Sequence, residues 1–419
     1  MKSRLFFRCL RHRGTLSLFV VLAAKGSLSA EPNSLWTRHA IDPSDQERHL
    51  SGADGVKFGD LNGDGLVDFV TGWEEGGKVR ICLNPGKEKV RQPWPAITVG
   101  RVPSPEDAVF SDLDQDGNLD VVSACEGKER RLHVHWAPSP GSPLLEEANW
   151  ITDTYASPEL AQWWMQILPH DMDRDGDTDL IAGSKNTAGS VTWLENPGGN
   201  EARNLNAWQI HEISSAGWIM SLTLSRFAGK ECLVYSDRKG SASGIWIAPL
   251  LPKAPWLETP RRVAAAGEEV MFLDIADIDG DDSPEILAAI RPATIRVYAS
   301  SADQTEPDGE WRVLHELAPL PWDRFGTVKA LRWHNTPGGS PEGGVLAVTC
   351  ENATEQRCGL LLATLSSEWS AIGGEEGVKF DLVDWVDLDE DGDSDLVTCE
   401  ERAGLGVVWY ENPGTVAGR

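Results

Sequence analysis

The stretch DLDQDGNLD (Asp112–Asp120) decides the fold, because its nine-residue pattern occurs five times along the chain. The other copies are DLNGDGLVD (60–68), DMDRDGDTD (171–179), DIDGDDSPE (277–285) and DLDEDGDSD (387–395). Oxygen-bearing side chains stand at positions 1, 3, 5 and 9, and four copies have Gly at position 6. Alternate side chains of a tight turn converge with this spacing, as a hard divalent cation requires.

The spacing of these acidic loops reveals a longer repeat. Their first residues are 60, 112, 171, 277 and 387, so two of the intervals are about twice the others. We therefore expect two repeats that lack the loop, near residues 225 and 332, where apolar strand-like sequence has no acid cluster. This gives seven units of about 54 residues, a period that indicates a repeat architecture.

Each unit contains four short strands. The first ends at the acidic loop, the second begins at the ninth loop residue, and the third often ends in an Asn-Pro-Gly turn. The fourth follows a tryptophan, and these are Trp36, Trp94, Trp150, Trp208, Trp256, Trp311 and Trp369. A solenoid, the rival architecture, would need atypical capping repeats at both ends.

Four-stranded units repeated in this way predict an all-β, seven-bladed β-propeller with four antiparallel strands per blade. The blades are expected to start near residues 55, 107, 165, 219, 269, 327 and 377, and the fourth and sixth lack the metal loop. A strand at about residues 36–42 is expected to complete the last blade, which leaves no open edge at the junction.

The first 30 residues predict a signal peptide, with a basic front, an apolar run and small residues near a cleavage site. Residues 31–419 then form a single propeller domain, exported to the periplasm or secreted, monomeric and without a transmembrane segment. The net charge of −27 excludes nucleic acid as a partner. In an oxidising compartment Cys350 and Cys358 could form a disulfide, or they could remain half-buried thiols.

The loops, their flanking strands and the Asn-Pro-Gly turns resemble FG-GAP/VCBS repeats, known from the head of integrin α-chains and from exported bacterial proteins. The resemblance covers residues 36–414 and implies up to five bound Ca²⁺ ions. The implied ligands are Asp60, Asn62, Asp64, Asp68, Asp112, Asp114, Asp116, Asp120, Asp171, Asp173, Asp175, Asp179, Asp277, Asp279, Asp281, Glu285, Asp387, Asp389, Asp391 and Asp395. The fourth loop is irregular because Asp282 replaces Gly and Glu285 replaces Asp, although Asp tolerates the positive φ expected there.

The ions are expected to staple the hairpins on one face of the ring, which assigns ligand binding to the opposite face. Two groups of residues are expected at that mouth of the channel. Acids beside exposed aromatic rings suit a carbohydrate, and these are Asp54, Asp107, Glu269 and Glu376 with Trp163, Trp164 and Trp218. The alternative is that the tryptophans pack between blades. Lys57, Lys329 and Lys379 either hold an anionic group or pair with neighbouring acids.

The sequence predicts no catalytic residues, since it contains none of the common hydrolase, metalloprotease or nucleotide-binding motifs. The recurring positions of His39, His211 and His315 favour a structural role. We therefore expect an exported binding or adhesion module for a glycan or a protein. The alternative is a carbohydrate-active lyase or dehydratase with its site at the channel mouth, and a third possibility is a purely structural component of the cell envelope.

Overall fold

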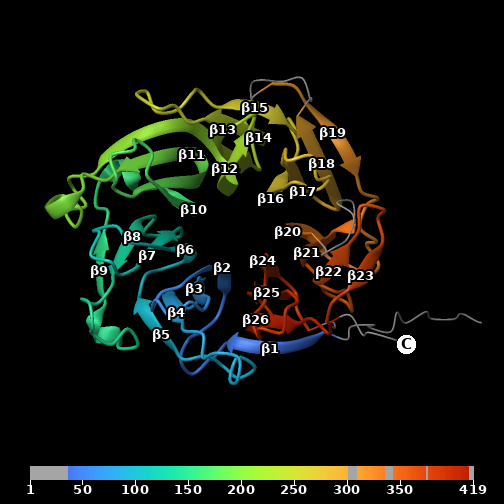
Figure 1. Cartoon of the computed structure of the whole chain (residues 1–419), viewed down its shortest axis with the longest axis horizontal. Helices are drawn as coiled ribbons and strands as arrows, with labels where there is room; N and C mark the ends of the chain where they lie inside the picture. Colours follow the sequence, from blue (N-terminus) through green and yellow to red (C-terminus); the bar gives the residue numbers. More distant parts are fainter. Residues whose placement is uncertain (1–35, 301–308, 336–342, 374–375, 415–419) are drawn as a thin grey trace, which may run out of the picture. The chain divides into compact units, whose positions relative to one another are not determined.

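Twenty-six β-strands form six antiparallel sheets that surround a central space as a β-propeller (Figure 1). This computed structural model describes residues 36–300, 309–335, 343–373 and 376–414. The expected signal peptide lies outside the described residues. The described residues contain no α-helix, and their short 3₁₀ turns include Glu147–Asn149, Pro158–Leu160 and Gly199–Glu201.

Five sheets have four strands each, which follow one another from the central space outward. They are β2 (Ala53–Gly59), β3 (Asp68–Trp73), β4 (Lys78–Cys82) and β5 (Ala96–Gly100); β6 (Pro105–Ser111), β7 (Asp120–Cys125), β8 (Leu132–Trp136) and β9 (Ile151–Thr154); β16 (Val270–Ala276), β17 (Glu285–Ile290), β18 (Thr294–Ser300) and β19 (Trp311–Glu316); β20 (Thr327–His334), β21 (Val345–Glu351), β22 (Leu360–Ala363) and β23 (Trp369–Ala371); and β24 (Phe380–Val386), β25 (Asp395–Glu400), β26 (Gly406–Glu411) and β1 (Thr37–Asp42).

The remaining sheet has six strands. It contains β10 (Trp163–His170), β11 (Asp179–Glu195), β12 (Gln209–Phe227), β13 (Lys230–Asp237), β14 (Gly244–Pro249) and β15 (Arg261–Ala264). The first part of β11 pairs with β10 and its second part with β12, and the second part of β12 pairs with β13.

The prediction of seven four-stranded blades is therefore wrong, because the structure has six blades, one of them six-stranded. The sequence expected for the third and fourth units is joined in one sheet, since β12 continues without a break over 19 residues. Two strands of this sheet, β10 and the second part of β12, border the central cavity, so the innermost strands still surround it completely.

The chain ends meet in the last sheet. β1 pairs antiparallel with β26, from Thr37 opposite Glu411 to Asp42 opposite Val407, so residues 36–42 complete this sheet as expected. A buried ion pair connects the closing strand to the next blade. The guanidinium of Arg80 on β4 donates to both carboxylate oxygens of Asp42, at 2.6 and 3.1 Å.

Most of the core lies between neighbouring sheets. All six residues of β3, β7, β17 and β25 are buried, because these second strands are covered on both faces. One core cluster combines Ile41 of the closing strand with Phe69 and Trp73 of β3 and Trp409 of β26. The hydrophobic contacts thus join the sheets around the ring.

The six cysteines of the described residues, which include Cys350 and Cys358, are buried free thiols. In the part of the chain that the structure describes, no helix is long and apolar enough to cross a membrane.

Replacing Asp42 with Ala should lower the free energy of unfolding by about 3–5 kcal/mol, because it leaves the guanidinium of Arg80 buried without its partner. Urea unfolding followed by tryptophan fluorescence measures the change. Asp45→Ala is the control, since it removes an exposed pair with Arg48 and should cost about 0–1 kcal/mol. Equal losses of unfolding free energy in the two variants would show that the buried pair of Asp42 and Arg80 contributes no more to stability than an exposed pair.

Candidate functional site

All five acidic loops occupy the same place in their sheets. Each connects the innermost strand to the second strand, and the second strand begins at the ninth loop residue, as the sequence predicted. Because the sheets share this strand order, the loops emerge at equivalent ends of the innermost strands. The candidate metal centres therefore occupy equivalent positions in their sheets.

The backbone of the loops has two left-handed residues. Position 6 has φ between 66° and 99° in every copy, and Asp282 adopts it where the other four have Gly, as expected. Position 4 also has positive φ in every copy, at Gly63, Gln115, Arg174, Gly280 and Glu390. Nothing in the sequence signals position 4, because its residue types vary. These two residues turn the chain so that side chains at odd positions approach one another.

Hydrogen bonds inside the loops follow one pattern. At position 1, one carboxylate oxygen accepts from the backbone N–H of position 6 at 2.9–3.2 Å in all five copies. At position 5, one oxygen accepts from the N–H of position 7 at 2.8–3.1 Å. The Oδ1 atoms of Asp112 and Asp171 at position 1 are buried and have no hydrogen-bond partner among the described residues.

The carboxylate at position 9 attaches each loop to its sheet. One of its oxygens accepts from the N–H of position 2 at 2.9–3.2 Å in all five loops. In four loops the other oxygen accepts at 2.7–2.8 Å from an N–H just after the end of β4, β8, β11 or β26, and these donors are Asn84, Ala137, Asn196 and Asn412. The ninth carboxylate therefore connects three segments of one blade.

Burial of these closing carboxyls disfavours their ionised form. It raises the pKa of Asp68 to about 6 and the pKa values of Asp120, Asp179, Glu285 and Asp395 to about 7. A cation close to such a group favours ionisation and opposes the effect of burial. A cation held in the loop would therefore stabilise the ionised form of the closing carboxyl.

The donor atoms fit a calcium-type ion. In three loops the carboxylates of positions 1, 3 and 9 bring ligand oxygens within 4.8 Å of one another, and these are Asp112, Asp114 and Asp120; Asp171, Asp173 and Asp179; and Asp277, Asp279 and Glu285. A set of oxygen ligands suits Ca²⁺ or Mg²⁺ rather than metals that prefer sulfur or imidazole.

Positively charged and polar side chains reach some of the loops from neighbouring segments. Arg203 forms a close ion pair with Asp114 and lies 3.7 Å from Asp116, while Arg91 pairs closely with Asp389. Gln115 donates to the carbonyl of Gly176 at 2.6 Å and thereby connects the second loop to the third. These contacts neutralise part of the acidic charge in the second and fifth loops.

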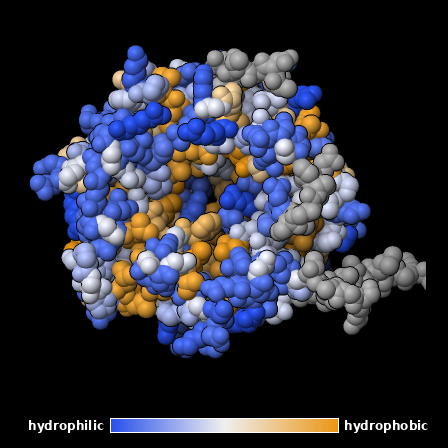
Figure 2. Space-filling model, in the orientation of Figure 1, coloured by the Kyte–Doolittle hydropathy of each residue, from blue (hydrophilic) through white to orange (hydrophobic). Residues whose placement is uncertain are grey.

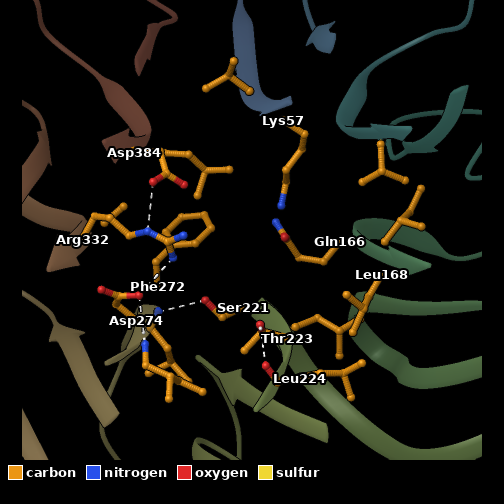
Figure 3. Close-up of a pocket in the computed structure, with 18 of the residues that line it drawn as sticks. Lys57, Gln166, Leu168, Ser221, Thr223, Leu224, Phe272, Asp274, Arg332 and Asp384 are labelled. Carbon is orange, nitrogen blue, oxygen red and sulfur yellow. Dashed lines mark hydrogen bonds and ion pairs between the residues drawn. The ribbon is translucent and has the colours of Figure 1, made fainter. Parts of the chain in front are cut away.

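The innermost strands border a central cavity of about 550 Å³. Figure 2 shows that hydrophobic and hydrophilic residues both border the hollow at the centre of the face in view. Inside the cavity, Lys57 and Gln166 point toward each other (Figure 3). Arg332 bridges Asp274 and Asp384 at 3.0 and 3.1 Å. Lys57 lies 3.9 Å from the buried Asp107 and is the less strongly paired cation.

Two of the three predicted ligand-binding lysines are instead paired inside the protein. Lys329 lies 2.5 Å from Asp381, and Lys379 forms a close ion pair with Glu401 and lies 3.8 Å from Asp54. Burial and the neighbouring Asp381 raise the pKa of Asp54 well above its usual value. Burial opposes the charge on Lys329, but Asp381 and Asp54 raise its pKa overall. This network connects β2, β20 and β24.

The three tryptophans expected as sugar platforms are buried or half-buried and have other contacts. Trp164 is 0% exposed and belongs to the core between sheets, which was the alternative interpretation. The guanidinium of Arg130 lies 4.4 Å from the ring centroid of Trp163. Three cations lie over the ring of Trp218. Of the remaining predicted residues, Glu269 lies 4.0 Å from Arg291 and Glu376 lies 3.8 Å from Arg38.

Sequence reasoning missed the basic residues around Trp218. Lys185 lies in β11, and Arg238 and Lys239 lie in the turn between β13 and β14. The available signal was the Arg-Lys pair at 238–239 in a chain with 65 acids against 38 basic residues.

The histidines make structural contacts. His39 and His211 each contact a glutamate, Glu411 at 2.8 Å and Glu195 at 2.7 Å, and each ring packs on a tryptophan of the adjacent strand. His135 is fully buried and contacts the hydroxyls of Ser123 and Thr152. Burial lowers the pKa of His135 to about 3 and that of His133 to about 4.

Comparison with known proteins supports the repeat assignment over part of the chain. The FG-GAP-like repeat family matches residues 60–123, which contain the first two acidic loops. A search of curated protein sequences gave no significant match.

Two solved structures share the fold over nearly the whole chain. They are crystal structures of BBS1N in complex with ARL6DN, one soaked with lead and one with mercury. The matches cover 91% of this chain and 98% of the matched chains, with TM-scores of 0.52 and 0.50 and identities of 11% and 12%. At these identities the similarity shows a common β-propeller fold and nothing further.

Replacing His135 with Gln tests the burial of this imidazole. An unfolded His binds a proton below about pH 6.5, whereas folded His135 binds one only near its pKa of about 3. The native protein therefore loses stability through this residue as pH falls between these values. The variant should reduce the difference in unfolding free energy between pH 7.5 and 5.0 by about 2 kcal/mol.

Chemical denaturation at the two pH values gives this difference. His49→Gln serves as control for the substitution itself, because His49 is exposed. An unchanged pH dependence in the His135 variant would rule out a neutral, desolvated imidazole at this position.

Proposed function

We propose that the protein is an exported β-propeller whose acidic loops bind up to five Ca²⁺ ions, and that it acts as a binding module. The observation that carries the calcium assignment is the common loop geometry, with two left-handed residues and the same carboxylate bonds in all five copies. The buried, unpartnered oxygens of Asp112 and Asp171 support it, because such atoms normally have a partner.

Each ion would be held by the side chains at positions 1, 3, 5 and 9 of its loop. Bound calcium would supply the positive charge that the buried carboxyls at position 9 lack. Extracellular calcium modules typically have Kd values of about 10⁻⁴–10⁻³ M, which suits constant occupancy outside cells. The basic and apolar character of residues 1–30 supports export. We also propose that the propeller resembles the head of integrin α-chains beyond the shared repeat.

The proposed ligand surface is the face opposite the metal loops, and a protein is the better-supported partner. A neutral glycan stacks on accessible aromatic faces, but Trp164 is buried and cations compete for the rings of the half-buried Trp163 and Trp218. The structures with a similar fold are of BBS1N in complex with ARL6DN, so a chain of this kind occurs in a complex with a second protein.

Removing calcium should destabilise the protein. In 2 mM Ca²⁺ each occupied site contributes about 2 kcal/mol if its Kd is about 10⁻⁴ M, so chelation with EGTA should lower Tm by on the order of 10 °C. Differential scanning calorimetry measures the shift, and excess calcium should reverse it. A melting curve that is the same with EGTA and with calcium would remove the stabilising role.

Calcium stoichiometry tests the individual loops. Asp175→Ala removes position 5 of the third loop and should reduce bound calcium by about one ion per chain, measured by equilibrium dialysis. Glu88→Gln, an exposed acid outside the loops, should leave the stoichiometry unchanged. If both variants bind as much calcium as the native protein, the third loop is not a site. Product formation from polysaccharides in parallel assays would instead favour the lyase or dehydratase alternative.

A further inference from the structure

A cluster of cations surrounds Trp218 near the turn that follows β13. The ammonium groups of Lys185 and Lys239 lie 4.5 and 4.4 Å from the indole ring centroid, and the guanidinium carbon of Arg238 lies at 4.6 Å. Lys185 comes from β11, Trp218 from β12, and Arg238 and Lys239 from the turn between β13 and β14. Cation–π attraction explains how three positive charges are held around one ring.

Two of these cations have no acidic partner. Lys185 forms a close ion pair with Glu126, and nearby Arg291 pairs closely with Glu351. Within the described part of the chain, neither Arg238 nor Lys239 forms an ion pair with a carboxylate. This is unusual in a chain with a net charge of −27, in which acids outnumber bases.

The cluster also has unused hydrogen-bond donors. The Nε atom of Arg238 and the Nε1 atom of Trp218 are both buried, and neither has an acceptor in the described residues. Unsatisfied buried donors cost free energy, so such groups in native proteins require an explanation. Here both unused donors and both unpaired charges can be satisfied by one kind of ligand, an anion with two or more acceptor oxygens.

The backbone around the cluster is well ordered by a buried acid. The carboxylate of Asp237 accepts from the N–H groups of Gly217, Trp218 and Lys239 at 2.7, 2.8 and 3.1 Å. The N–H of Arg238 donates to the carbonyl of Trp218 at 2.8 Å. Because Asp237 is itself 1% exposed and makes these three bonds, it fixes the turn rather than neutralising Arg238.

The neighbouring acids do not prevent an anion from binding. Glu126 and Glu351 are neutralised by Lys185 and Arg291, and Glu269 lies within 4.0 Å of Arg291. Burial, followed by the charges of Asp54 and Glu126, raises the pKa of Glu106 well above its usual value. Burial and Arg291 lower the pKa of Arg238, an effect that a bound anion would reverse.

We propose that Arg238, Lys239 and Trp218 bind a carboxylate of an acidic peptide segment in a partner protein. The inference rests on the proposed binding function and specifies the chemistry of its ligand. The Arg fork can hold a carboxylate with two hydrogen bonds, the indole N–H supplies another donor, and Lys239 adds charge at the exposed side. An acidic peptide fits better than an acidic sugar, because three cations already lie 4.4–4.6 Å from the centroid of the Trp218 ring, where a sugar ring would stack.

Fluorescence anisotropy with a labelled hexaglutamate peptide tests this proposal in saturating calcium. The native protein should bind hexaglutamate but not hexaglutamine, and affinity should fall as salt rises. Arg238→Glu with Lys239→Glu should weaken binding by about tenfold or more, as expected for lost hydrogen bonds to charged groups. Lys89→Glu with Lys253→Glu is the control, because it changes net charge equally at two exposed sites elsewhere.

Several outcomes would overturn the proposal. Equal weakening in the two double variants would mean general electrostatic attraction, and binding of oligogalacturonate instead of hexaglutamate would assign the site to an acidic glycan. If the double variant at Arg238 and Lys239 has an altered Tm, the single variant Lys239→Gln, at an exposed position, is used instead. The proposal then requires that this single variant binds hexaglutamate more weakly than the native protein. Calcium stoichiometry is measured on the same samples. Five bound ions without peptide binding would reject only the acidic ligand, whereas absence of calcium would reject the proposed function.

Discussion

Each blade with an acidic loop depends on the hydrogen bonds that the carboxylate at the ninth loop position accepts. It joins the start of the loop to the second strand and, in four loops, to the segment just after β4, β8, β11 or β26. It does so at a buried position, where ionisation is disfavoured. The residue that organises the hairpin is therefore also the residue that most needs a nearby cation. With calcium bound as proposed, folding of the blade and metal binding would be coupled through this one side chain.

The strand content could be predicted from the sequence because the acidic loops repeat in register with apolar segments. The number of blades could not. Spacing located the strands of the third and fourth units, but it did not show that β12 runs through the junction between those units. It also did not show that β11 spans the segments expected as the second and third strands of the third unit. Whether a strand stops between two repeats depends on local hydrogen bonds, such as the pairing of Lys185 with Trp218, which periodicity does not reveal. The closure of the ring by β1 was predictable, since a lone strand before the first unit needs a partner.

The candidate site was predicted unevenly for a similar reason. The acidic loops follow from a local motif, so the sequence located them at the start of the second strands and anticipated the positive φ of Asp282. The ligand face depends on which side chains from different blades meet, and sequence position alone does not determine this. Lys329 and Lys379 occupy equivalent positions in their repeats, yet both form ion pairs with buried acids. Trp218 was expected to stack on a sugar ring, whereas three cations from neighbouring segments lie against its ring.

Most of the basic residues discussed above differ from Arg238 and Lys239 in having an acidic partner within the chain. Several basic residues are already committed to acids of the chain: Arg80 to the closing strand, Arg332 to the cavity acids, and Lys329 to the buried network. In so acidic a chain, a cation that remains unpaired is under strong attraction to many alternative partners. Arg238 and Lys239 avoid them because Asp237 directs its oxygens to backbone N–H groups and Trp218 holds both cations against its ring. An arrangement that withholds two positive charges from the protein's own acids leaves them available for an acid of another molecule.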